Sequence, residues 1–186
     1  MSPREYLRWE AQQNLRYEYI DGEIVAMTGG TLPHNSITLN LAAALKAHLR
    51  GKNCKVFMAD AKLQISDTVY VYPDVAVTCD CRDLEATKQL QHPKLIIEVL
   101  SPGTEAKDRG RKFYHYRRLL SLREYCLVTP DVQQVECYRL NDRGKWELTT
   151  YSAEETDGLT LTSVGLDCLF SLVYEDVVLP TDGEIL

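Results

Sequence analysis

One stretch decides the fold, Lys94-Leu95-Ile96-Ile97-Glu98-Val99-Leu100-Ser101-Pro102, a short apolar run that stops at a turn signal. An uninterrupted apolar run of this length is typical of a central strand that is covered on both faces, and Ser-Pro-Gly is a common turn signal. A carboxylate buried in such a strand is costly unless it is paired, protonated or bound to a metal. Glu98 therefore needs a partner inside the molecule.

A second carboxylate enters another apolar strand earlier in the chain, in Tyr72-Pro73-Asp74-Val75-Ala76-Val77. Alternation along this segment places Asp74 on the opposite face from Val75 and Val77. We predict that Asp74 and Glu98 meet at one metal site.

The whole chain has the size and composition of one globular domain. It contains 186 residues, of which 45% are apolar, so a sizeable core is expected. We find no signal-peptide pattern and no apolar run of 18 residues, and the sequence therefore predicts a cytoplasmic protein without a membrane span. Most of the six cysteines lie in apolar segments, which predicts reduced thiols in the core.

Charge is distributed unevenly along the chain. The net charge of −6 argues against a nucleic-acid partner, yet residues 152–186 contain eight acids and no Lys or Arg. Residues 105–123 contain seven Lys or Arg against two acids. This basic segment is compatible with a phosphate-bearing partner, and equally with an ordinary solvated helix face.

The order of expected elements predicts an α/β (α+β) fold with a mixed sheet flanked by helices. A capping box opens a helix at Ser2, and a hairpin turns at Asp21-Gly22. The further expected elements are helices over 34–49 and 105–120, strands over 54–65, 69–77, 94–100 and 124–128, and a hairpin of 135–140 with 146–151. In the acidic tail we expect four residues to be buried: Leu166, Leu169, Phe170 and Leu172.

Lys112 lies on the apolar side of the second expected helix, on one stripe with Asp108 and Tyr116. A lysine in such a place usually reaches a partner. Two inward carboxylates and a lysine form a minimal hydrolytic metal site, since Mg²⁺ or Mn²⁺ needs few protein ligands and keeps several waters. A metal and a nearby ammonium together suit phosphodiester hydrolysis.

These motifs form an ordered set that resembles the Uma-two family within the PD-(D/E)XK, or restriction-endonuclease-like, nuclease superfamily. The motifs that carry the resemblance are Asp21-Gly22-Glu23, His34 at a helix start, Tyr72-Pro73-Asp74-Val75, Ile97-Glu98-Val99-Leu100-Ser101-Pro102, Thr104, Asp108, Lys112 and Tyr116, Glu124-Tyr125 and Pro130-Asp131. The resemblance implies an αβββαβ core over about residues 16–140, within a single domain of residues 1–186. An N-terminal hairpin is added to this core, and residues 141–186 supply C-terminal strands and the acidic tail. It further implies metal-dependent cleavage of DNA by a homodimer.

The chain departs from the superfamily at position 100, where Leu100 stands in place of the expected lysine. We expect Lys112 to take its role. The predicted catalytic residues are Asp74, Glu98, Lys112 and Glu23, with Asp74 and Glu98 as the metal ligands. The predicted substrate-binding residues are His34, Arg109, Arg111 and Tyr116.

Each candidate also has a purely structural interpretation. Asp74 can cap a turn, Glu98 can pair with a core cation, and Lys112 can pair with Asp108 one helical turn away. Glu23 can be a solvated hairpin residue. The alternative function is a catalytically degenerate nuclease fold that acts as an oligomeric binding protein.

Overall fold

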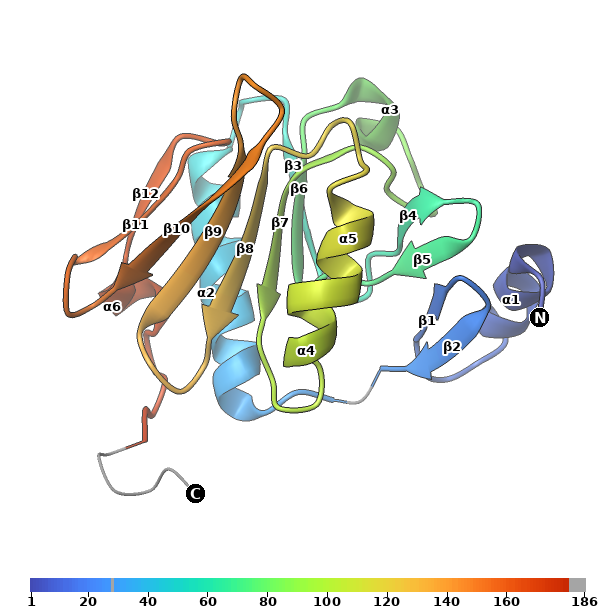
Figure 1. The fold of residues 1–186 in the computed structure, drawn as a ribbon, viewed down its shortest axis with the longest axis horizontal. Helices are drawn as coiled ribbons and strands as arrows, with labels where there is room; N and C mark the ends of the chain where they lie inside the picture. Colours follow the sequence, from blue (N-terminus) through green and yellow to red (C-terminus); the bar gives the residue numbers. More distant parts are fainter. Residues whose placement is uncertain (28, 181–186) are drawn as a thin grey trace.

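A six-stranded mixed sheet forms the centre of the computed structural model, which describes residues 1–27 and 29–180 (Figure 1). In pairing order the strands are β10 (Trp146–Ser152), β9 (Gln134–Leu140), β8 (Glu124–Thr129), β7 (Pro93–Val99), β6 (Val75–Thr78) and β3 (Lys55–Met58). Strands β7 and β8 pair in parallel, and the other neighbours pair antiparallel. The strand around Glu98 is therefore internal, and the predicted mixed sheet is confirmed.

A second, four-stranded sheet carries the N-terminal hairpin. Its strands pair in the order β2 (Glu23–Ala26), β1 (Tyr17–Ile20), β5 (Val69–Val71) and β4 (Leu63–Ser66). The hairpin turns where predicted, because Asp21 (φ 51°) and Gly22 (φ 95°) both adopt the left-handed conformation that a tight two-residue turn requires. Helix α1 (Pro3–Glu10) precedes it and begins with the predicted capping box at Ser2.

Helices cover the central sheet on opposite faces (Figure 1). Helix α2 (Leu32–His48) packs on one face. On the other lie α4 (Glu105–Lys107), the π-helix η1 (Asp108–Lys112) and α5 (Phe113–Tyr116). The remaining elements are α3 (Cys81–Leu84), β11 (Gly158–Leu161), β12 (Leu166–Leu169) and α6 (Phe170–Val173).

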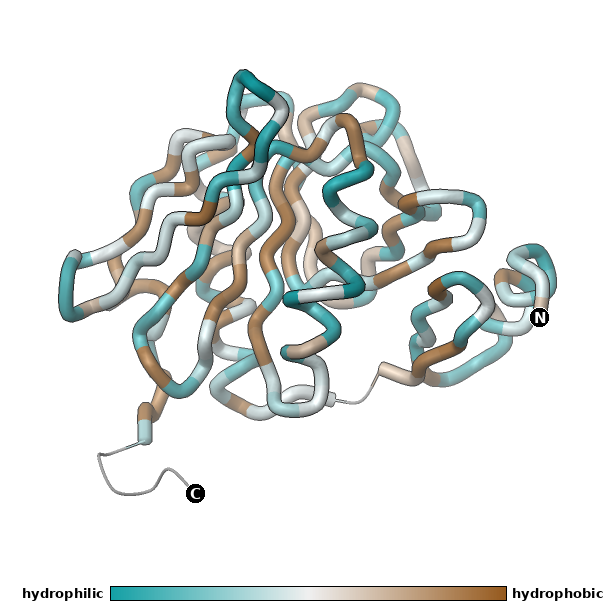
Figure 2. The backbone as a smooth tube through the Cα atoms, in the orientation of Figure 1, coloured by the Kyte–Doolittle hydropathy of each residue, from teal (hydrophilic) through white to brown (hydrophobic). Residues whose placement is uncertain are grey.

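Strand β7 divides its side chains between the two faces. Leu95, Ile97 and Val99 join the core that α2 covers, whereas Ile96 and Leu100 join the core under α5. Alternation therefore turns Glu98 toward the face of η1 and α5. Figure 2 shows that the hydrophobic residues concentrate along the central strands, with hydrophilic residues in the surrounding loops.

The prediction of one strand over 54–65 and one over 69–77 was wrong, because each segment forms two strands that belong to different sheets. Strand β3 ends at Met58, and Ala59 follows at a positive φ of 53°. Pro73, which has no N–H for a strand ladder, separates β5 from β6. Asp74 consequently stands at the point where the chain crosses from the second sheet to the central one.

The helix expected over 105–120 is shorter and less regular than predicted. It ends at Tyr116, and its middle turn is the π-helix η1. Both ends of η1 are buried, with Asp108 2% and Lys112 6% exposed. Single π-turns are rare and are frequent at functional sites, and this one brings two charged residues inside the molecule.

The expectation of reduced thiols was wrong for two of the cysteines. Cys54 and Cys79 form a disulfide. Cys54 directly precedes β3 and Cys79 directly follows β6, so the two cysteines lie beside the Lys55–Thr78 pair of these antiparallel strands. The sequence pattern does not reveal this register. Cys126, Cys137 and Cys168 are buried free thiols, as predicted.

The C-terminal segment is buried only in part. Phe170 is buried and Leu166 packs against the core, as expected. The prediction was wrong for Leu169 and Leu172, which are 58% and 41% exposed, because the short helix α6 turns only Phe170 and Val173 inward. Acidic residues Asp182 and Glu184 lie outside the described residues. No helix in the described part of the chain combines the length and apolarity that a membrane crossing requires.

Candidate active site

Asp74 and Glu98 are joined through the backbone at the ends of β6 and β7. The Asp74 amide donates to Glu98 Oε2 over 3.2 Å, and Asp74 Oδ2 accepts from the Val99 amide over 2.8 Å. Each carboxylate is thus oriented by the strand that carries the other. Their side chains line one cavity, so the structure brings the two predicted carboxylates together.

The Lys112 ammonium lies among three carboxylates. Its Nζ is 2.9 Å from Glu18 Oε1, 3.1 Å from Glu98 Oε1 and 3.3 Å from Asp108 Oδ1. Burial by itself lowers the pKa of Lys112, but the negative charges of the three carboxylates outweigh burial and hold this pKa well above its usual value. Lys112 is therefore a permanent positive charge at this site.

Glu98 has a second neutral donor, besides the Asp74 amide and the Lys112 ammonium. The Tyr116 hydroxyl donates to Glu98 Oε1 over 2.7 Å. Burial raises the pKa of Glu98 well above its usual value, and the charges of Asp74 and Asp108 add to this effect against the opposing influence of Lys112. The site therefore resists full ionisation of Glu98 unless a further cation is present.

His34 approaches Asp74 from the start of α2. Thr31 caps this helix by accepting a hydrogen bond from the His34 amide. The imidazole Nε2 lies 3.2 Å from Asp74 Oδ2, and this hydrogen bond is the main reason why the pKa of His34 is raised above its usual value. Gly30 lies against the other side of the ring, where a Cβ would come within 2.9 Å of His34 Nδ1.

These side chains surround a cavity of about 300 Å³, which we call the acidic cavity. It is lined by Glu18, Asp74, Glu98, Asp108, Lys112, Lys107 and His34, together with residues of the loop before α2. Oδ1 of Asp108 is buried and lies 3.3 Å from the Lys112 ammonium, but among the described residues it has no partner with hydrogen-bond geometry. Four carboxylates share the cavity with Lys112, Lys107 and His34, so the donor set is rich in the carboxylate oxygens that a hard divalent cation favours.

In the described residues, one group of three potential metal ligands has its ligand atoms within 4.8 Å of one another, and it lies outside the acidic cavity. It consists of Glu124, Cys126 and Cys137. However, the Glu124 carboxylate already accepts hydrogen bonds from Arg139, Ser163 and Thr162. We therefore interpret this group as a structural network beneath β8 and β9.

The family model of Uma2, described as "Putative restriction endonuclease", matches residues 3–169. The chain belongs to the Uma2 family. The family that the motifs predicted from the sequence is thereby confirmed, and the match includes every residue of the acidic cavity named above.

Two other proteins are similar to this chain over most of their length. The "Uncharacterized protein slr1290" of Synechocystis sp. (strain ATCC 27184 / PCC 6803 / Kazusa) is 42% identical over 175 residues, which are 94% of this chain and 91% of that protein. The "Uncharacterized protein sll1609" of the same organism is 32% identical over 160 residues, 84% and 90% of the two chains.

A solved structure from Anabaena variabilis ATCC 29413, described as "a putative nuclease belonging to DUF820", has the same fold as this Uma2 chain. The TM-score is 0.78 at 18% identity, over 94% of this chain and 97% of the other. This similarity confirms the predicted fold class, a central mixed sheet flanked by helices, which this chain shares with a putative nuclease.

The predicted site residues of the Uma2 chain fall into two groups. Asp74, Glu98, Lys112 and His34 meet at the acidic cavity. Glu23 does not, because it is exposed on the β1–β2 hairpin and pairs there with Arg111. Arg109 pairs with Glu105 and Glu136, so neither predicted arginine lines the cavity.

Tyr116 requires a correction as a substrate-binding residue. It is fully buried and cannot contact a ligand, and its hydroxyl orients Glu98 instead. Sequence reasoning also missed Glu18, and it treated Asp108 only as a competitor for Lys112. Glu18 lies between Tyr17 and Tyr19 in a short strand. A carboxylate between two aromatic residues of a strand was the feature from which a buried role for Glu18 could have been predicted.

Proposed function

We propose that this protein is a metal-dependent endonuclease that hydrolyses phosphodiester bonds in DNA. The observation that carries the proposal is the meeting of Asp74, Glu98 and the Lys112 ammonium at one cavity. Family membership and the nuclease-like structural neighbour support it. The acidic cavity has an excess of carboxylates that a divalent cation would balance.

Asp74 and Glu98 would hold the cation, which supplies Lewis-acid polarisation of the scissile phosphate when bound. Lys112 stays protonated and therefore acts by stabilising developing negative charge rather than by accepting a proton. His34 reaches the same cavity, and its raised pKa favours the imidazolium form. An imidazolium at this position would be able to give a proton to the leaving oxygen.

Calorimetric titration with Mg²⁺ and Mn²⁺, with and without DNA, tests the metal. The wild-type protein is expected to bind the cation and Glu98→Gln to lose this binding, because the amide keeps the shape and removes the charge. Glu85→Gln, an exposed position outside the cavity, is the matched control. Plasmid assays then compare nicked, linear and intact DNA for the same three proteins.

Cation binding and plasmid cleavage that Glu98→Gln abolishes would support the proposal. Cleavage that Glu98→Gln leaves intact would contradict it. If the wild-type protein neither binds a cation in the presence of DNA nor cuts it, the interaction-protein alternative is favoured. Linear product formed without accumulation of nicked plasmid would indicate that two copies act together on one duplex.

A further inference from the structure

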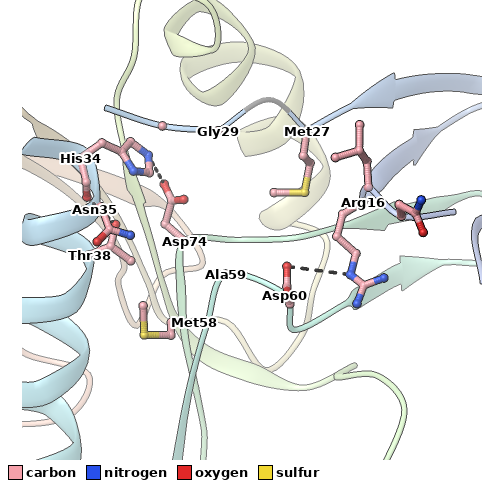
Figure 3. A pocket seen from close by; sticks show the side chains of 13 residues that line it. Arg16, Met27, Gly29, His34, Asn35, Thr38, Met58, Ala59, Asp60 and Asp74 are labelled. Carbon is pink, nitrogen blue, oxygen red and sulfur yellow. Dashed lines mark hydrogen bonds and ion pairs between the residues drawn. The ribbon is translucent and has the colours of Figure 1, made fainter. Parts of the chain in front are cut away.

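Asp74 and His34 form a shared wall between the acidic cavity and a second cavity of about 400 Å³, which we call the side cavity. Figure 3 shows the His34–Asp74 pair at one side of the side cavity and the Arg16–Asp60 pair at the other. A volume of this size is in the range, about 300–1,000 Å³, that small-molecule sites occupy. Any ligand here would lie directly beside the proposed reaction centre.

The lining of the side cavity has the chemistry of a nucleobase site. Met27 and Met58 offer thioether and methyl groups, which contact the faces of aromatic rings favourably. Asn14 and Asn35 are exposed and offer amides, which can donate to and accept from the edge of a base.

The charges of the side cavity disfavour a bare phosphate. The carboxylates of Asp60 and Asp74 lie there beside Arg16 and His34, and Arg16 is already 3.8 Å from Asp60. The cavity therefore offers no unopposed positive charge to an anion, whereas a carboxylate readily accepts from the amino group of a base.

The backbone at this cavity is strained. Ala59 is a non-glycine residue at a φ of 53°, and it lies between two lining residues, Met58 and Asp60. Its amide donates to the carbonyl oxygen of Asp74 over 3.1 Å. Strain of this kind persists where surrounding structure enforces it and clusters at ligand sites, and here it couples the side cavity to Asp74.

We infer that the side cavity binds one unpaired nucleobase of the strand whose phosphate lies at the acidic cavity, so that the substrate is single-stranded or locally opened DNA. A base inside a duplex cannot enter a cavity unless it is flipped out. The charge pattern agrees, because strong duplex binding needs many free cations. The protein has a net charge of −6, and Arg109 and Arg111 are engaged by glutamates.

Binding of two labelled pentamers, measured by fluorescence anisotropy, tests this inference. Ca²⁺ replaces Mg²⁺ in the assay, so that a hard cation is available to the acidic cavity while cleavage is suppressed. One of the two is a deoxyadenosine pentamer, and the other is a fully abasic pentamer with the same phosphates. The wild-type protein is expected to bind the deoxyadenosine pentamer about tenfold more tightly, a difference typical of one well-placed base contact. Asn14→Ala and Asn35→Ala should reduce this ratio toward one, and Gln12→Ala, exposed and outside the cavity, should keep it.

Equal wild-type affinity for the two pentamers would overturn the inference, as would a ratio that persists in the double variant Asn14→Ala/Asn35→Ala. Tighter binding of a matching duplex than of the single strand would also overturn it. Circular dichroism verifies that the variants are folded.

The inference rests on the proposed function, and the two can fail separately. Hydrolysis of bis(p-nitrophenyl) phosphate, which contains no nucleobase, reports on the proposed reaction alone. Hydrolysis without base discrimination would contradict the side-cavity inference and support the proposed nuclease activity. Base discrimination without hydrolysis would contradict the nuclease activity and support a nucleobase site in the side cavity.

Discussion

The backbone amide of Asp74 donates a 3.2 Å hydrogen bond to the carboxylate of Glu98. In return, the residue after Glu98 donates its amide to the carboxylate of Asp74. The two predicted metal ligands are therefore not independent side chains that happen to converge. A change at either position alters the orientation of the other. The effect of a double substitution on stability should therefore differ from the sum of the effects of the two single substitutions.

Replacing Lys112 by methionine should leave three carboxylates around an apolar side chain. Breaking a buried charge network in this way costs about 3 kcal/mol or more, which corresponds to a fall in melting temperature of roughly 10 °C for a chain of this size. Thermal denaturation with and without Mg²⁺ measures the effect. Mg²⁺ should restore more stability to Lys112→Met than to the wild-type protein, and equal restoration would argue that the carboxylates do not share a cation.

Glu18→Gln and Glu23→Gln test which glutamate belongs to the reaction centre. The structure places Glu18 there, whereas the sequence predicted Glu23. Glu18 is buried and 2.9 Å from Lys112, and its loss should lower hydrolysis about tenfold by releasing the ammonium. Glu23 belongs to an exposed ion pair, so Glu23→Gln should leave both the melting temperature and the rate of hydrolysis nearly unchanged. Steady-state rates and melting curves of both variants give the answer, and a larger rate loss in Glu23→Gln would restore the role predicted from the sequence.

Gly30→Ala should separate His34 from Asp74. The new Cβ would lie 2.9 Å from His34 Nδ1 and 3.0 Å from Cγ, so the ring must move. Since the hydrogen bond to Asp74 is the main cause of the raised pKa of His34, this pKa should fall in the variant. An NMR titration of the imidazole measures it. Gly29→Ala is the matched control, because nothing lies within 4 Å of a Cβ at that position, and a pKa shift there of the same size would remove the steric explanation.

Glu10 should make stability depend on pH in the acid range. Burial alone raises the pKa of Glu10, but hydrogen bonds from Lys62 and Tyr72 outweigh it and bring this pKa below the usual 4.5. A lowered folded-state pKa means that the stabilisation is fully present above pH 4.5 and is lost as the pH falls through the lower value.

Glu10→Gln should therefore be less stable than the wild-type protein at neutral pH, because the Lys62 ammonium loses its charged partner. The two proteins should converge below the folded-state pKa. Chemical denaturation across the acid range measures both curves. A constant difference at all pH values would mean that packing, and not charge, accounts for the effect.

The central sheet was predictable because its signals are local. The apolar run around Glu98, the Asp21-Gly22 turn and the hairpin of β9 and β10 each carry their own pattern. The crossing between the two sheets was not predictable in this way. It depends on the positive φ of Ala59 and on how the chain continues after Pro73, and both are consequences of packing.

The candidate site was likewise predictable only where its signals are local. Asp74, Glu98 and Lys112 stood out as charged residues in apolar surroundings, which is a property of the local sequence. Glu18 and the pairing of Glu23 with Arg111 depend on how the N-terminal hairpin docks against the helices. The disulfide of Cys54 and Cys79 likewise depends on the register of β3 and β6.

The position of Glu18 on β1 has a consequence for how the protein folds. The ammonium of Lys112 receives one of its three anions from the second sheet and two from elements on the central sheet. A folding intermediate that contains only the central sheet would hold Lys112 with an incomplete set of counter-charges. We therefore expect the docking of the hairpin to be a late, cooperative event that completes the reaction centre.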